Sequence, residues 1–218
     1  LQTFVSMEQF KKELIAYLQK YSISPEESVR AWKTFGKNSI DIIKADPYSL
    51  CRDPINIDFE RADEISFSLA YEKDDQFRIR AGIMHVLLHN TNNGHTCLPL
   101  DKLIIATAQF LEVSIDQVSE IITIMKDDKK IITDIIDEKE FVFSNEMYIK
   151  ETYSATRLLL MLNFPPKTIN GVKEDILEIE KNKDISYADL QKKAINDALT
   201  KGILVLTGGP GTGKTTTL

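Results

Sequence analysis

The C-terminal stretch of the chain contains the pattern that most constrains its fold. Residues 203–218, ILVLTGGPGTGKTTTL, join a continuous apolar run to a glycine-rich turn. An apolar run of this kind is typical of a strand buried in a parallel sheet. Gly208, Gly213, Lys214 and Thr215 match the G-x-x-x-x-G-K-[ST] pattern of a phosphate-binding loop. The sequence therefore predicts a strand, a loop and a helix that begins near Lys214.

Each residue type in this loop has a separate task in binding a nucleoside triphosphate. Glycines let the backbone curl until its N–H groups point at phosphate oxygens. The start of the following helix adds the positive end of its dipole. The Lys214 ammonium would reach the β- and γ-phosphates, and the Thr215 hydroxyl would bind Mg²⁺. The residues of the loop expected to bind nucleotide are Gly208, Gly209, Pro210, Gly211, Thr212, Gly213, Lys214, Thr215 and Thr216.

Length, charge and cysteine content narrow the class of protein. The chain has 218 residues and a net charge of -6, so any contact with nucleic acid must come from a local patch. Cys51 and Cys97 form neither a disulfide framework nor a CxxC pair, which favours a reducing cytoplasm. No apolar run approaches the roughly 20 residues needed to span a bilayer. Because residue 1 is Leu and the chain stops just after the loop, we expect a fragment of a longer cytoplasmic protein.

Residues 1–72 are expected to form a series of short helices. Ser6 and Gln9 have the spacing of a capping box at the start of a first helix. Ser24 and Glu27 have the same spacing at the start of a second helix. Helical periodicity then recurs after each turn, which indicates a small helical region.

Residues 73–150 follow a different pattern. The elements expected here are a helix over 76–90, a strand over 95–98, helices over 100–111 and from Ser114 to 125, and a hairpin around the turn DEK at 137–139. Helix, strand, two helices and a hairpin is the order of a winged helix. An apolar helix over 151–163, a charged connector to 185, and an amphipathic helix capped by Ser186 and closed by Gly202 complete the chain.

The tail from Leu190 onward, LQKKAINDALTKGILVLTGGPGTGKTTTL, resembles superfamily 1 DNA helicases, in particular the RecD-like (RecD/TraA) helicases. In those enzymes a glutamine upstream of the loop recognises the adenine ring, and Gln191 stands in the matching place. Further landmarks of the family's N-terminal region recur in order. They are Phe35-Gly36, Asp46-Pro47-Tyr48-Ser49-Leu50, INIDFERAD at 55–63 and NGHTCLP at 93–99.

The resemblance implies a mainly α protein with an α/β end. Its expected parts are a helical, helix-hairpin-helix-like region at 1–72, a winged-helix-like domain at 73–150, a helical connector at 151–185 and the start of a RecA-like P-loop motor domain at 186–218. The whole protein would be an ATP-dependent DNA helicase that uses ATP and Mg²⁺ and moves 5′ to 3′ on single-stranded DNA. Lys214 and Thr215 would be its catalytic residues.

Two functional alternatives remain open at this point. The first is the N-terminal part of such a helicase. This chain alone is then expected to be inactive, because the family's acidic Mg²⁺ partner, water-positioning residue and arginine finger lie downstream of the loop. The other reading is a non-catalytic module that binds DNA or a protein partner and carries a truncated P-loop. The sequence downstream of residue 218 would distinguish the two. No particular protein partner is implied.

One departure from the family pattern concerns DNA binding. The family has Gly-x-Gly in its hairpin, where this chain has Asn56 and Asp58. Both residue types tolerate unusual backbone angles, so the hairpin is expected to survive. The Asp58 carboxylate would repel a DNA phosphate, so we expect a structural hairpin and weak DNA binding by this chain.

Three other signals favour ordinary structural roles. His85 and His89 share a helix face, but no glutamate base or cysteine ligand accompanies them, so metal binding is not expected. Arg78 and Arg80 are expected on a solvated helix face, with a backbone phosphate as the alternative. The acidic hairpin turn makes the wing a poor candidate for DNA contact.

Overall fold

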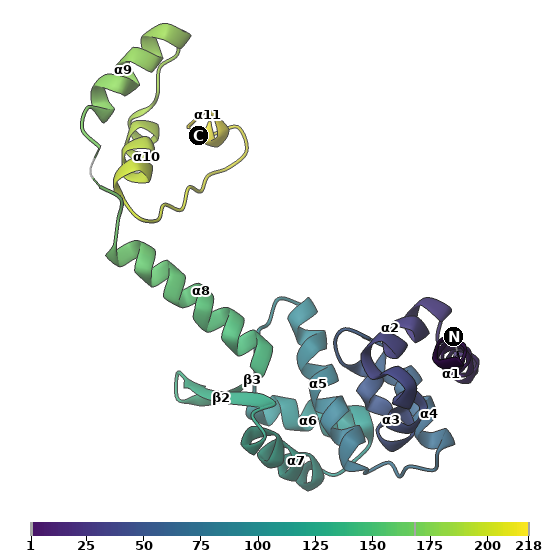
Figure 1. The fold of residues 1–218 in the computed structure, drawn as a ribbon. Helices are drawn as coiled ribbons and strands as arrows, with labels where there is room; N and C mark the ends of the chain where they lie inside the picture. The colour runs from purple at the N-terminus through teal and green to yellow at the C-terminus, as the bar shows by residue number, and fades with distance from the viewer. Residues whose placement is uncertain (1, 168, 218) are drawn as a thin grey trace. The chain divides into compact units, whose positions relative to one another are not determined.

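The computed structural model describes residues 2–167 and 169–217 and is mainly helical, with one small sheet (Figure 1). The chain divides into two compact units, residues 1–148 and residues 149–218. Each unit is described by itself. Among the described helices, none is long and apolar enough to cross a membrane.

The first part of the first unit is a set of short helices. They are α1 (Gln2–Gln19), α2 (Pro25–Phe35), the 3-10 turn η1 (Gly36–Asn38), α3 (Ser39–Ala45), the 3-10 turn η2 (Pro47–Cys51) and α4 (Phe59–Ser68). The capping box at α2 is confirmed, because the Glu27 N–H donates to Ser24 Oγ at 3.2 Å and the Ser24 N–H donates to Glu27 Oε2 at 2.8 Å. The predicted cap at Ser6 is wrong, since α1 already begins at Gln2. Residues 2–5 contain neither Pro nor Gly, so nothing there stops the helix from extending.

The second part of the first unit combines three helices with a sheet. Its elements are α5 (Gln76–Asn92), β1 (Cys97–Pro99), α6 (Leu100–Leu111), α7 (Ile115–Asp127), β2 (Ile131–Ile136) and β3 (Lys139–Ser144). The antiparallel sheet has the order β1-β3-β2. Asp137 and Glu138 form the tight turn between β2 and β3 with left-handed φ angles of 48° and 63°. The expected order of helix, strand, two helices and hairpin is confirmed.

Two apolar clusters hold the first unit together. One gathers Leu14, Leu18, Ile43 and Ile65 among α1 to α4. The other centres on α5, α6 and α7, and it also includes Tyr48, Phe59 and Ala62 from η2 and α4. The N-terminal helices and the helix–sheet elements therefore share a core.

The second unit contains most of α8 (Asn145–Asn163), together with α9 (Val172–Lys183), α10 (Asp189–Thr200) and the short α11 (Lys214–Thr217). The apolar run 203–207 is extended but forms no strand, so that prediction is wrong. A strand needs a hydrogen-bonded neighbour, and no described residue of the chain pairs with this run. Val205 is consequently 79% exposed. The predicted cap of α10 is also wrong, since Ala188 rather than Ser186 precedes the helix.

Candidate nucleotide-binding site and the helix-hairpin-helix region

The loop at 208–214 has the backbone geometry that its glycines allow. Gly211 and Gly213 have φ angles of 74° and 77°, in the left-handed region that favours glycine. Lys214 is the first residue of α11, as predicted. The loop therefore turns directly into a helix start, with Thr215 and Thr216 in its first turn.

The Lys214 ammonium lies against the loop itself. Nζ donates to the carbonyl oxygens of Gly208 and Gly209, each at 2.7 Å. The Thr212 hydroxyl also donates to the Gly209 carbonyl, at 2.9 Å. A phosphate group that enters the loop would have to compete with these two carbonyls for the ammonium.

Gln191 reaches this loop from α10. Its Oε1 accepts the Ala188 N–H at 2.9 Å, which caps the helix start. Its Nε2 donates to the Gly213 carbonyl at 3.2 Å. The structure thus brings Gln191 into contact with Gly213 of the loop, 22 residues away in the sequence.

A second contact fixes the position of α10. Lys192, the next residue, pairs with Glu180 of α9 at 2.9 Å. Glu180 also accepts the Tyr187 N–H at 2.7 Å. Both contacts favour the charged carboxylate, and the hydrogen bond from Lys192 is the main cause of the lowered Glu180 pKa. Sequence analysis missed this contact, because it joins two helices across a connector.

The hairpin between η2 and α4 keeps the shape expected of it. Asn56 has a left-handed φ of 54°, so asparagine takes the conformation available to the family's glycine. Asp58 has an ordinary extended backbone with φ of -61°. The N–H groups of Ile55 and Asn56 donate to the Arg52 carbonyl at 2.9 and 3.1 Å, and the Ile57 N–H donates to the Leu50 carbonyl at 3.0 Å. These three donors hold the turn closed.

The carboxylate of Asp58 has a compensating cation. Arg61 donates to Asp58 at 2.7 Å and to both oxygens of Glu27, each at 2.9 Å. The hydrogen bond from Arg61 is the main reason that the Glu27 pKa falls to about 2. The Arg61 guanidinium therefore ties the hairpin to the start of α2 and offsets part of the negative charge of Asp58.

Arg78 is a structural residue, and both expectations for it are wrong. It is 6% exposed, so it lies neither on a solvated face nor within reach of DNA. Its guanidinium binds Asp63 at 2.9 and 3.1 Å and also donates to the carbonyls of Lys73 and Leu111. The start of α5 packs between α4 and the end of α6, which buries the side chain. Tyr48 donates a hydrogen bond to the same Asp63 carboxylate.

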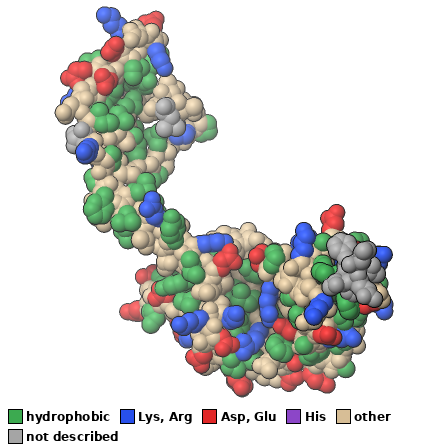
Figure 2. Space-filling model, in the orientation of Figure 1, with side chains coloured by type: hydrophobic (Ala, Val, Ile, Leu, Met, Phe, Trp, Pro, Cys, Tyr) green, Lys and Arg blue, Asp and Glu red, His purple; other side chains and the backbone are tan. Residues whose placement is uncertain are grey.

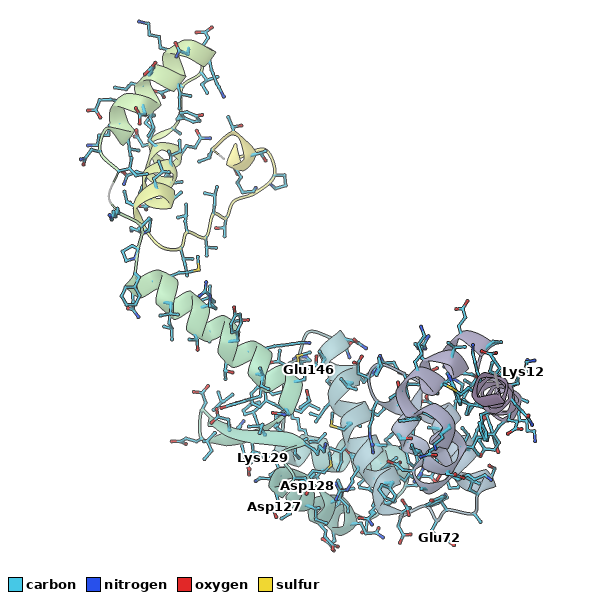
Figure 3. The ribbon with its side chains drawn as sticks, in the orientation of Figure 1. Lys12, Glu72, Asp127, Asp128, Lys129 and Glu146 are labelled. Carbon is cyan, nitrogen blue, oxygen red and sulfur yellow. The ribbon has the colours of Figure 1, made fainter. Side chains whose placement is uncertain are left out.

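Arg80 and the histidines lie elsewhere on the first unit. Arg80 forms an ion pair with Asp128 at 2.8 Å. Asp128 follows α7 and is labelled in Figure 3. The His85 ring stacks on Phe110 at 4.7 Å between centroids, and Phe59 lies 5.5 Å from the same ring. His85 is thus part of an aromatic cluster. Within the described ranges, no group of three or more His, Cys, Asp and Glu side chains is arranged to hold a metal ion.

Comparison with known proteins identifies two regions of the chain. Residues 7–97 match the HHH domain of the ATP-dependent RecD2 DNA helicase, and residues 191–218 match an AAA domain. The first match continues through α5 into β1, which agrees with the core that these elements share with α4. An AAA domain implies ATP binding, and the match begins at Gln191.

A curated protein is similar to this chain along most of its length. The chain is 24% identical over 225 aligned residues to the ATP-dependent RecD2 DNA helicase of Deinococcus radiodurans. The alignment covers 97% of this chain and 31% of the relative, so the chain spans less than a third of that protein. Through its HHH match, its AAA match and this similarity along nearly its whole length, the chain resembles the RecD2 DNA helicases.

Proposed function

We propose that this chain is the N-terminal part of an ATP-dependent DNA helicase that binds single-stranded DNA and duplex junctions and unwinds duplex DNA. The observation that carries the proposal is the loop at 208–214, with Gly211 and Gly213 in left-handed conformations and Lys214 at the helix start. This geometry is suited to cradling phosphates with backbone N–H groups. The similarity to RecD2 helicases adds DNA as the partner, and the cysteine content favours the cytoplasm as the place of action.

The proposed chemistry assigns a role to each residue of the site. Lys214 would leave the Gly208 and Gly209 carbonyls and neutralise charge on the transferred phosphoryl group. The Thr215 hydroxyl would bind Mg²⁺, and Gln191 would recognise adenine. Gly208, Gly209, Pro210, Gly211, Thr212, Gly213 and Thr216 would surround the phosphates.

Two features of the second unit suit a motor domain that further sequence would complete. Residues 203–207 are extended and unpaired, which suits a strand that joins a parallel sheet. Residues 158–162 of α8, LLLML, are all exposed, and Figure 2 shows green hydrophobic side chains on the surface of this unit. In the proposed full-length protein, the rest of the AAA domain would supply partner strands. The acidic Mg²⁺ partner and the arginine finger would come from the same region.

The first unit would guide the DNA. The order α5, β1, α6, α7, β2 and β3 is that of a winged-helix-like domain, and we take η2, the hairpin and α4 as the helix-hairpin-helix-like part. Because the hairpin N–H groups of Ile55, Asn56 and Ile57 are used internally, we assign this hairpin a structural role. The module alternative, in which these parts bind DNA or a protein without catalysis, predicts no ATP turnover.

Lysine replacement in the full-length protein tests the proposal. Wild-type protein should hydrolyse ATP faster with single-stranded DNA present and should unwind a duplex with a 5′ overhang. Lys214→Ala should reduce turnover by at least about a hundredfold, because a contact of this kind stabilises the transition state by several kcal/mol. Steady-state ATPase and strand-displacement assays measure both activities.

The controls separate the motor from the module. Lys201→Ala changes an exposed lysine near the end of α10 and should leave turnover unchanged. Preference for a 3′ overhang would refute the proposed polarity. Robust turnover by Lys214→Ala, or none by the wild type, would refute the proposed helicase.

A further inference from the structure

We infer that Gln191 is a positioning residue for the phosphate loop, in addition to any contact with the base. The inference rests on the proposed function and deepens it. The starting observation is the hydrogen bond from Gln191 Nε2 to the Gly213 carbonyl at 3.2 Å. This contact links the first turn of α10 to the peptide that precedes Lys214.

The Gly213 carbonyl belongs to the peptide that orients the Lys214 N–H. Because a peptide is planar and trans, its C=O and the N–H of the next residue point in opposite directions. Holding the Gly213 carbonyl toward α10 therefore aims the Lys214 N–H away from α10. The same carbonyl accepts the Thr217 N–H at 3.1 Å and the Thr217 hydroxyl at 2.9 Å. Gln191 thus braces the first turn of α11 at the donor that a bound phosphate would use.

The packing at Gly213 fits this role. A Cβ atom at this position would lie 2.5 Å from Gln191 Nε2, closer than nonbonded atoms approach. Gly213 also has a φ of 77°. The backbone angle therefore favours glycine at 213, and any larger residue there would also have to displace the Gln191 amide.

The amide of Gln191 has enough hydrogen-bonding groups for two tasks. A glutamine side chain offers two N–H donors and two acceptor lone pairs. Gly213 takes one donor and Ala188 takes one lone pair. One donor and one lone pair remain, which is the pair that an amide uses on the N7 and N6 atoms of adenine. Base recognition and loop positioning are therefore compatible in one side chain.

Binding of a ligand that lacks a base distinguishes loop positioning from base recognition by Gln191. We would measure binding of ATP and of tripolyphosphate to the full-length protein with Mg²⁺, by competition with a fluorescent ATP analogue. The variants are Gln191→Ala and the matched control Asn196→Ala, which removes an exposed amide from the same helix. Loss of one hydrogen bond should weaken tripolyphosphate binding about threefold to tenfold in Gln191→Ala. Asn196→Ala should bind both ligands like the wild type.

Each other outcome overturns the inference. If Gln191→Ala weakens ATP binding only, or neither ligand, the residue does not position the loop. If Asn196→Ala weakens tripolyphosphate binding equally, the effect belongs to α10 as a whole. If the wild type binds neither ligand, the proposed function fails and this inference fails with it.

Discussion

Asp63 joins three segments of the first unit through one carboxylate. Asp63 lies on α4, and its carboxylate accepts hydrogen bonds from Tyr48 of η2 and Arg78 of α5. Tyr48 and Asp63 each lie in one of the sequence landmarks, at 46–50 and 55–63. Their contact gives those landmarks a physical meaning, since Asp63 pairs with the buried Arg78 guanidinium and Tyr48 donates to the same carboxylate.

Asp63→Ala tests this junction. The side chains of Arg78 and Asp63 are 7% and 15% exposed, so removal of the carboxylate leaves a nearly buried charge unpaired. We expect the free energy of unfolding of residues 1–148 to fall by roughly 3–5 kcal/mol. Urea denaturation followed by circular dichroism measures it.

A surface ion pair provides the control for Asp63. Lys73 and Glu112 pair at 2.7 Å, but their side chains are 63% and 74% exposed. Lys73→Ala should therefore change stability little, because water and salt screen such pairs. An Asp63→Ala protein as stable as Lys73→Ala would show that the junction contributes nothing.

At the scale of elements, local signals predicted most of the first unit. The capping box at Ser24 is confirmed, and Ser114 caps α7 in the same way, since each side chain accepts the N–H three residues later. Such signals depend mainly on neighbours in the chain, although the same spacing at Ser6 and Gln9 does not begin a helix. The prediction of a strand at 203–207 was wrong because a strand depends on a non-local partner, which no described segment provides.

In the candidate site, too, local features were predictable from the sequence and contacts between distant segments were not. The glycine spacing predicted the loop and the helix start at Lys214, because backbone freedom is a local property. The burial of Arg78 was not predictable from its own segment, since its partner Asp63 lies on another helix. The contact between Gln191 and Gly213 likewise depends on how α10 packs against the loop.

The contact between α2 and the hairpin gives a prediction on pH. Arg61 lowers the Glu27 pKa from 4.5 to about 2 in the folded protein. A lowered pKa stabilises the fold at pH values above 4.5, and this contribution is lost as the pH falls from about 4.5 to 2. Glu27→Gln should therefore destabilise residues 1–148 at pH 7 by about 1.5–3 kcal/mol, the range for hydrogen bonds to charged groups.

Denaturation curves at several pH values measure this effect. The difference in stability between wild type and Glu27→Gln should be constant from pH 7 to 5 and should shrink below pH 4.5. Glu26→Gln, in the same helical turn but exposed, is the control and should show no such pattern. A difference between wild type and Glu27→Gln that stays constant down to pH 2 would contradict the role of Arg61.

At the scale of the whole molecule, cores rather than sequence patterns define the units. Residues 1–148 form one compact unit and residues 149–218 another. The family model for the HHH domain also crosses residue 73 and continues to 97. We therefore propose that the helix-hairpin-helix and winged-helix-like parts fold together.

Truncation tests this proposal. A protein of residues 1–148 retains both apolar clusters, so we expect it to unfold in a single transition by calorimetry and by circular dichroism. A protein of residues 73–150 lacks Tyr48, Phe59 and Ala62, which belong to the core of α5, α6 and α7. It also lacks Asp63, so Arg78 would lose its partner. We expect this shorter protein to melt well below residues 1–148, or to remain unfolded. Two separate transitions in residues 1–148, with the later one matching the melting of 73–150, would show instead that the two parts fold independently.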